Sequence, residues 1–427
     1  MEQTFKIITQ NCGQFSLTFL PKKEGEIEFY HYLISPFVTK IDEKLYLNQQ
    51  QINTLELQKK ISETYSRIKK DHPEINKLLK FFEIIPLDEY FIILPREFKS
   101  SKEEWMFEAH VKSLNHSSIL SEQQKFFHQE ISKVEKLLPN MLDNFDIYSP
   151  SIDKKKSIGE KSKDKRRCRF CDRAQIDGAT FKKIAHAIPF ALGNKNLILN
   201  EECDSCNEYF GSSIEPNFIY QYDILRSFHG LEGRGGNIKI KTKDFLMHNN
   251  NGQVFINAQQ INVSDAPDGT ITTRTGRVRK YTPEYDYKLL CKIALSIIPR
   301  KEIGNYQETI KWLRFNEKPS REIPNILVAK TKTIVTRVAA YKKKNNEIEL
   351  PNLICEFCFC GFIFVFPVPL SSTDDGIEMD LSKNKKFKET FLHYKLLEDE
   401  MKPLDLSSPI ETEAEDVIKF IKYQPKP

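Results

Sequence analysis

The chain has 427 residues and a formal net charge of +5, and 40% of its residues are hydrophobic. This length exceeds what one ordinary hydrophobic core accommodates, so we expect two or three domains. The modest charge excludes a molecule that binds polyanions through net charge alone. The longest apolar run, Phe362 to Leu370, contains two prolines and is too short to cross a bilayer, so we expect no membrane segment.

Residues 1–150 are expected to form an N-terminal α/β domain of unknown role. Apolar residues cluster as in strands at 4–8, 15–20 and 90–94, and they recur with helical spacing over 53–70 and 121–142. The N-terminus lacks the charged and then apolar pattern of a signal peptide. No group of residues in this part of the sequence suggests catalysis.

Residues 151–167 are rich in lysine and serine and poor in apolar side chains, which predicts a flexible basic linker. A solvated tether is its simplest role. Contact with a phosphate backbone is a second role, because the segment directly precedes a cysteine cluster.

Two Cys-x-x-Cys pairs follow the linker, at Cys168, Cys171, Cys203 and Cys206. Four thiolates with this spacing complete a tetrahedral structural zinc site. In small zinc peptides such a site contributes an apparent folding free energy on the order of 10–16 kcal/mol. The chain has nine cysteines, an odd number that fits metal thiolates in a reducing compartment better than a disulfide framework. We therefore predict a cytoplasmic protein.

The residues between the two pairs predict a compact unit of strand, loop, strand and helix, over 180–188, 190–194, 196–199 and the stretch after 203. His186 lies near the end of the first strand. Asp204 or Ser205 is placed to cap the helix, and Asn207 falls in its first turn.

Residues 231–427 are expected to form a C-terminal β-rich α+β domain. Strands are predicted at 237–242, 253–257, 270–274, 325–341 and 353–368, and helices at 283–298, 306–315 and 385–397. The run that contains Cys355, Cys358 and Cys360 is almost continuously apolar, which predicts a strand buried on both faces. Positions three apart in a strand face opposite sides, so we assign these cysteines to the core rather than to a metal.

The segment 168–230 resembles the HNH endonuclease family, in the subgroup with four zinc-binding cysteines. The matching residues are His186 in AHAIPFALGNK, the strand NLILN and the closing CDSCNEYFG with Asn207. The resemblance implies a ββα-metal fold for this segment. The whole chain is then an α+β, multidomain protein in which a zinc-stapled nuclease module lies between the two other domains.

The resemblance also implies roles for single residues. His186 would be the general base that activates water, a role suited to a histidine pKa near neutrality. Asn207 would hold a catalytic divalent ion, Mg²⁺ or another, through its side-chain oxygen. An asparagine would orient the ring of His186, and Asn196 and Asn200 are equal candidates. Asn194 stands where many relatives carry glycine, which predicts a left-handed turn.

One position departs from the family pattern. Ala185 stands where relatives often carry an acidic metal ligand. Three explanations are open: the ion is held by fewer protein ligands and more water, another acid such as Glu215 or Asp204 approaches, or activity is lost.

Basic residues gather around the first cysteine pair and the first strand of the segment. Phosphate contacts of this kind position a nucleic-acid backbone without reading its sequence. The candidates are Arg166, Arg167, Arg169, Arg173, Lys182 and Lys183. A second group is either another such surface or a solvated face; it comprises Arg274, Arg277, Arg279 and Lys280.

The preferred hypothesis is a metal-dependent endonuclease that hydrolyses phosphodiester bonds in DNA, with RNA as an open alternative substrate. Residues 1–150 and 231–427 would restrain or target it through a protein partner, as in bacterial defence or a mobile element. The alternative is a non-catalytic four-cysteine zinc module that binds nucleic acid or a protein.

Overall fold

The computed structural model divides the chain into two compact units, Met1–Asp143 and Asn144–Pro427. It describes residues 3–19, 24–41, 44–99, 101–137, 141–152, 155–233, 235–250, 252–258, 262–263, 271–331, 334–397 and 401–420. None of the helices in these ranges is long and apolar enough to span a bilayer.

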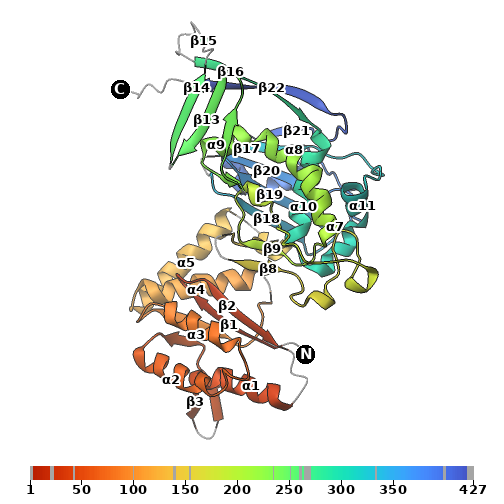
Figure 1. The fold of residues 1–427 in the computed structure, drawn as a ribbon. Coiled ribbons are helices and arrows are strands. Elements are labelled where there is room, and N and C mark those ends of the chain that lie inside the picture. Colours follow the sequence, from red (N-terminus) through yellow and green to blue (C-terminus); the bar gives the residue numbers. More distant parts are fainter. Residues whose placement is uncertain are drawn as a thin grey trace. The chain divides into compact units, whose positions relative to one another are not determined.

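The first unit is an antiparallel sheet with helices on both faces (Figure 1). Its sheet order is β2-β1-β6-β5, and β3 pairs with β4. The strands are β1 (Gln3–Thr9), β2 (Gln14–Phe19), β3 (Val38–Ile41), β4 (Lys44–Leu47), β5 (Gln50–Ile52) and β6 (Tyr90–Leu94). The helices are α1 (Glu24–Ile34), α2 (Leu55–Ser66), α3 (Ile75–Ile84), α4 (Ser101–His116) and α5 (Leu120–Leu137), with α6 (Met141–Asn144) where the units divide.

Alternation along β1 explains the two helical layers. Ile7 packs into the core that α1, α2 and α3 cover, whereas its neighbour Ile8 packs with Val111 and Leu114 of α4. Successive side chains of a strand point to opposite faces, so both faces of β1 need an apolar cover.

The second unit is built on a six-stranded antiparallel sheet of order β21-β17-β20-β19-β18-β7. Its strands are β7 (Phe145–Tyr148), β17 (Ile326–Lys330), β18 (Arg337–Lys343), β19 (Leu353–Phe359), β20 (Phe362–Pro367) and β21 (Lys402–Leu404). Smaller sheets are formed by β8 (Lys156–Ile158) with β9 (Leu197–Leu199), β10 (Glu232–Gly233) with β11 (Gly236–Asn237), β12 (Lys239–Lys241) with β13 (Phe245–Asn250) and β14 (Gln253–Ala258), and β15 (Asn262–Val263) with β16 (Ile271–Tyr281) and β22 (Thr412–Phe420). The helices are α7 (Asp204–Ser212), α8 (Ile214–Gln221), α9 (Asp223–Phe228), α10 (Pro283–Ile297), α11 (Gln307–Phe315) and α12 (Lys385–Thr390).

The apolar run 353–368, predicted as one strand, is a hairpin of β19 and β20. Its two-residue turn is Cys360-Gly361, and both residues have positive φ, 49° and 80°. Two-residue turns of this kind require positive φ. The sequence did not predict this turn because it lies within an almost continuous run of apolar residues. Cys355 and Cys358 are fully buried in β19, which confirms their assignment to the core.

Two other predicted elements are also shorter than expected. The strand 325–341 is two strands, β17 and β18, which β20 and β19 separate in the sheet. The helix 385–397 is α-helical only over α12 and continues as a 3-10 helix, Leu392–Leu397.

Helix α10 is the buried centre of the second unit. It lies beside α8 over one face of the six-stranded sheet (Figure 1). One hydrophobic core contains Phe210 of α7, Phe218 of α8, Leu290 of α10 and Phe357 of β19. The cysteine segment and the C-terminal residues therefore share a core, although the sequence suggested separate modules.

The segment expected to be a flexible linker carries regular structure. Lys156–Ile158 form β8, parallel to β9, and the backbone N–H of Glu160 donates to the Glu201 carboxylate across 3.2 Å. Composition could not predict this pairing, because the backbone hydrogen bonds between β8 and β9 do not depend on which side chains the segment carries.

Candidate functional site

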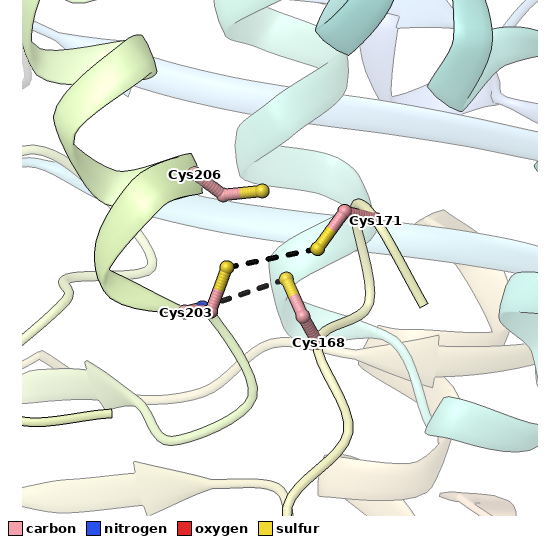
Figure 2. A group of neighbouring side chains, drawn as sticks. All are labelled: Cys168, Cys171, Cys203 and Cys206. Carbon is pink, nitrogen blue, oxygen red and sulfur yellow. Dashed lines mark hydrogen bonds between the residues drawn. The ribbon is translucent and has the colours of Figure 1, made fainter. Parts of the chain in front are cut away.

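The four predicted zinc ligands converge. Cys168 and Cys171 lie in a loop, Cys203 precedes α7 and Cys206 lies in its first turn (Figure 2). Their Sγ atoms all lie within 4.8 Å of one another, and no other group of three or more histidine, cysteine or acidic residues does so in the described part of the chain. Four soft thiolates at this separation fit a tetrahedral zinc ion that has no open coordination position.

Two arginines border the cysteine cluster. The Nε–H of Arg314, in α11, donates to Cys206 Sγ across 3.1 Å, and its guanidinium lies 4.4 Å from the Tyr209 ring centroid. Arg173 is exposed and donates to the Ser205 hydroxyl across 3.0 Å. Four thiolates and one Zn²⁺ would carry a net charge of −2, which nearby cations stabilise.

His186 forms an isolated antiparallel β-bridge with Ile198 of β9, and the extended residues 185–187 around it are called the His186 strand below. The backbone N–H of Ala187 donates to the Leu197 carbonyl at 3.1 Å, and that of Leu199 to the Ala185 carbonyl at 2.9 Å. His186 and Ile198 are thus a non-hydrogen-bonded pair, and the backbone N–H and C=O of His186 point away from β9.

The predicted strand 180–188 does not form beyond the single β-bridge at His186, and Asp204 binds the first residues of the segment instead. The Asp204 carboxylate accepts from the Thr180 hydroxyl at 2.6 Å and from the backbone N–H groups of Lys182 and Lys183 at 3.1 and 2.8 Å. Burial opposes ionisation of Asp204, but these donors outweigh it and lower its pKa. The predicted cap was wrong: Cys203 is the N-cap, and no side chain caps the helix.

Asn194 holds the loop between the two strands, but not in the predicted way. The left-handed residue is Gly193, with φ of 89°. Asn194 is fully buried, and its amide donates to the carbonyls of Ile188 and Leu197 at 2.8 and 3.0 Å. Its side-chain oxygen accepts from the backbone N–H of Leu197 at 2.8 Å. It therefore fixes the path from the His186 strand to β9.

The two asparagines proposed to orient His186 flank Ile198 in the sequence. Asn196 directly precedes β9 and Asn200 directly follows it, so each lies two residues from Ile198, the partner of His186. The Asn196 amide donates to the Ile152 carbonyl at 2.8 Å, and the Asn200 backbone N–H donates to the Ile158 carbonyl at 2.9 Å. Their role toward His186 stays a prediction.

A buried lysine that sequence reasoning missed touches this site. The Nζ of Lys292, in α10, donates to the backbone carbonyl of His186 across 2.9 Å. It also lies 5.7 Å from the ring centroid of Phe210, which follows Asn207 by about one turn of α7. The Lys292 ammonium therefore contacts both the His186 strand and the helix that carries Asn207. The available signal was a lysine among the apolar residues of α10, in KLLCKIAL.

The carboxylates near this ammonium are paired. Lys292 Nζ lies 3.3 Å from Glu202 and 3.2 Å from Glu215. Burial raises the pKa of Glu202 to about 7. Burial alone would lower the pKa of Lys292, but the two carboxylates reverse this and raise it. Glu215 and Asp204 were considered above as substitutes for an acid at Ala185. Glu215 is paired with Lys292, and Asp204 accepts from Thr180, Lys182 and Lys183.

The predicted nucleic-acid contacts divide into exposed and buried residues. Arg167, Arg173, Lys182 and Lys183 are exposed, and Arg166 is partly exposed. Arg169 is an exception: its side chain is 1% exposed and lies 2.6 Å from the Glu201 carboxylate. It is not placed to contact a phosphate, because it would have to leave a buried ion pair.

The second basic group is largely neutralised. Arg277 lies 3.1 Å from Asp223, and Arg279 forms an ion pair with Asp416. Lys280 pairs with Glu413 at 3.2 Å. The side chain of Arg274 lies outside the described residues. This group is a paired surface between β16 and its neighbours rather than a free basic face.

Comparison with known proteins identifies the cysteine segment. Residues 168–223 match the family described as HNH endonuclease. With the four converging cysteines, this match confirms the resemblance to the zinc-stapled members of that family. No curated protein and no solved structure was found to match the chain. The match assigns a nuclease-type, metal-binding segment and leaves the residues on either side unassigned.

Proposed function

We propose that the chain is a metal-dependent endonuclease that hydrolyses phosphodiester bonds in DNA at the site around His186. The observation that carries this proposal is the β-bridge between His186 and β9, after which the chain leads into a helix anchored by the four-cysteine cluster. The family match over residues 168–223 supports it.

His186 acts as the general base that removes a proton from the attacking water. Asn196 or Asn200, at the two ends of β9, orients its ring. A divalent ion, when bound, stabilises the charge on the phosphate and on the leaving oxygen. Asn207 is the residue that would hold this ion, through its amide oxygen.

Ala185 limits how a hard cation can be bound. Glu202 and Glu215 are paired with Lys292, and Asp204 is occupied by its three donors. Asn207 would therefore be its main protein ligand, with water and substrate phosphate oxygens completing the shell, as Mg²⁺ accepts. The four thiolates fit zinc, and the cysteine cluster stays structural.

The exposed basic residues around the cysteine cluster contact the phosphate backbone. Arg166 and Arg167 directly precede Cys168, and Arg173 follows Cys171 by two residues. The backbone N–H groups of Lys182 and Lys183 donate to Asp204 at the start of α7. Such contacts position DNA without sequence preference. RNA presents the same phosphates and remains the competing substrate.

The flanking parts of the chain restrain or target the nuclease through a protein partner, in a cytoplasmic role such as defence or a mobile element. A free nuclease is toxic, and in the described parts of the chain no second group of three or more histidine, cysteine or acidic side chains converges outside the cysteine cluster. Deletion of residues 1–143 should then increase toxicity or change the substrate range. Unchanged toxicity, activity and specificity would contradict this role.

Cleavage of supercoiled plasmid, single-stranded DNA and RNA in the presence of Mg²⁺ or Mn²⁺ tests the proposal. Nicking and linearisation of the plasmid are expected. Preferential cleavage of RNA would change the substrate, and binding of DNA without cleavage under any divalent ion would favour the alternative, a non-catalytic zinc module.

A further inference from the structure

We propose that Lys292 is a positioning residue for His186, a buried ammonium outside the family-matched segment that fixes the strand carrying the base. This inference rests on the proposed nuclease function. Lys292 touches neither substrate nor metal; it acts through the backbone of His186.

The geometry of the β-bridge at His186 creates the need for such a donor. His186 is in a non-hydrogen-bonded pair with Ile198, so its carbonyl faces away from β9 and requires a donor from elsewhere. Lys292 Nζ provides it across 2.9 Å, and the lysine side chain is 1% exposed. Water therefore has little access to replace this bond.

The same ammonium joins three more parts of the site. Glu202 directly precedes the zinc ligand Cys203, and its carboxylate is 3.3 Å from Lys292 Nζ in an ion pair. Glu215 lies in the first turn of α8 and accepts a hydrogen bond at 3.2 Å. Phe210 lies in the helix that carries Asn207. The Lys292 ammonium thus contacts the strand of His186, the residue before the zinc ligand Cys203 and the helix that carries Asn207, and it holds them in fixed positions relative to one another.

The kinetics of a Lys292 variant distinguish a residue that only stabilises the fold from a residue that positions the base. A base displaced by about 1 Å can lower the rate of the chemical step about 100-fold, whereas DNA affinity depends on remote phosphate contacts. Loss of Lys292 should therefore lower kcat and leave KM for DNA nearly unchanged.

Lys288 provides a matched control, since it lies one turn earlier in α10 and its side chain is only 2% exposed. Its Nζ donates to Asn316 at 2.8 Å and pairs with Glu284 at 3.5 Å. Lys288→Met should lose a comparable amount of stability but keep kcat within about threefold, because its contacts lie outside the His186 strand.

The experiment compares full-length Lys292→Met with Lys288→Met and wild type, at equal zinc content and at a temperature where all are folded. We expect Lys292→Met to lose about 100-fold in kcat with KM changed less than threefold. A wild-type kcat in folded Lys292→Met, or an equal loss in Lys288→Met, would overturn the inference.

If Lys292→Met does not fold, Lys292→Arg decides. Arginine keeps the charge but places its donors differently, so about a tenfold loss of kcat is expected. A wild-type kcat in Lys292→Arg would then mean that Lys292 only neutralises the neighbouring carboxylates and does not position His186.

A second measurement does not depend on cleavage. The ring ¹⁵N shifts of His186, assigned with His186→Ala, should change in the Lys292 variant and not in Lys288→Met. If wild type never cleaves, the proposed function fails while these shifts still test the positioning. Unchanged His186 shifts in the Lys292 variant would contradict it.

Discussion

The guanidinium of Arg169 lies 2.6 Å from the carboxylate of Glu201, and the two side chains are 1% and 5% exposed. Arg169 also donates to the carbonyls at the C-terminal end of α10, those of Leu295, Ser296 and Ile298. These carbonyls have no partner within the helix, and a cation there also complements the helix dipole. Arg169 thus connects the first cysteine pair to the helix that carries Lys292.

Arg169 should therefore behave as a structural residue. Arg169→Met leaves the buried Glu201 carboxylate without its closest partner, and we expect a loss of about 3–5 kcal/mol in the free energy of unfolding. Urea denaturation measures this. A fully stable Arg169→Met with weakened DNA binding would contradict this role.

The matched surface variant is Lys183→Ala. Lys183 is exposed and pairs with Glu208 at 3.1 Å, so its loss should change stability by less than about 0.5 kcal/mol. It should weaken DNA binding and reduce the slope of log K against log salt by about 1. An unchanged salt slope would remove Lys183 from the DNA-binding surface.

Loss of one thiolate should release the structural metal. Cys203→Ser leaves three of the four sulfur ligands, and we expect less than one zinc per chain and a lower melting temperature. Elemental analysis and calorimetry measure both. Cys12→Ser, in the first unit, is the control and should keep its zinc. Full zinc content in Cys203→Ser would refute the four-cysteine site.

Arg314 lies outside the family-matched residues 168–223, and it should strengthen zinc binding by the four cysteines. Arg314→Gln removes the Nε–H donor to Cys206 Sγ, and we expect about 10–100-fold weaker zinc binding. Transfer of zinc to a chromophoric chelator measures the change. Lys311→Ala, an exposed position in the same helix, should match wild type. Equal transfer from Arg314→Gln and Lys311→Ala would show that the contact is dispensable.

Asp286 should make stability fall with rising pH. Burial raises its pKa to about 7, although Asn217 and Gln221 donate to it. The unfolded carboxyl has a pKa of about 3.9, so above that pH the folded state retains a proton that the unfolded state has lost. Stability from this group is complete below about pH 4 and is lost as the pH rises to about 7.

Between pH 6 and 8 this loss amounts to about 1.4 kcal/mol. Asp286→Asn should reduce the decrease in the free energy of unfolding over this range by that amount. Urea denaturation of both proteins at the two pH values checks it. The same decrease in wild type and variant would mean that Asp286 is ionised in the folded protein throughout.

Local spacing in the sequence was enough to predict the cysteine cluster. Cys168, Cys171, Cys203 and Cys206 converge as their pattern predicts, because two Cys-x-x-Cys loops that bind the same ion must lie next to each other. The almost continuous apolar run of β19 likewise placed Cys355 and Cys358 in the core. Both conclusions depend on residues close together in the chain.

Long-range pairing could not be predicted in this way. Lys292 lies 106 residues from His186, and Arg169 lies 126 residues from the Leu295 carbonyl. Each residue has an ordinary local context, a lysine on a helix and an arginine in a basic run. Their roles arise only when α10 packs under the cysteine segment. A buried charge needs its partner in space, and the sequence does not display that partner.

The proposed role of His186 as the base of a hydrolytic site is tested by single-turnover cleavage of plasmid DNA in Mg²⁺. Wild type and His186→Ala are compared at equal zinc content and equal DNA occupancy. We predict cleavage by wild type and a loss of at least about 100-fold in His186→Ala, with DNA binding retained. Equal cleavage by the two proteins would contradict the account.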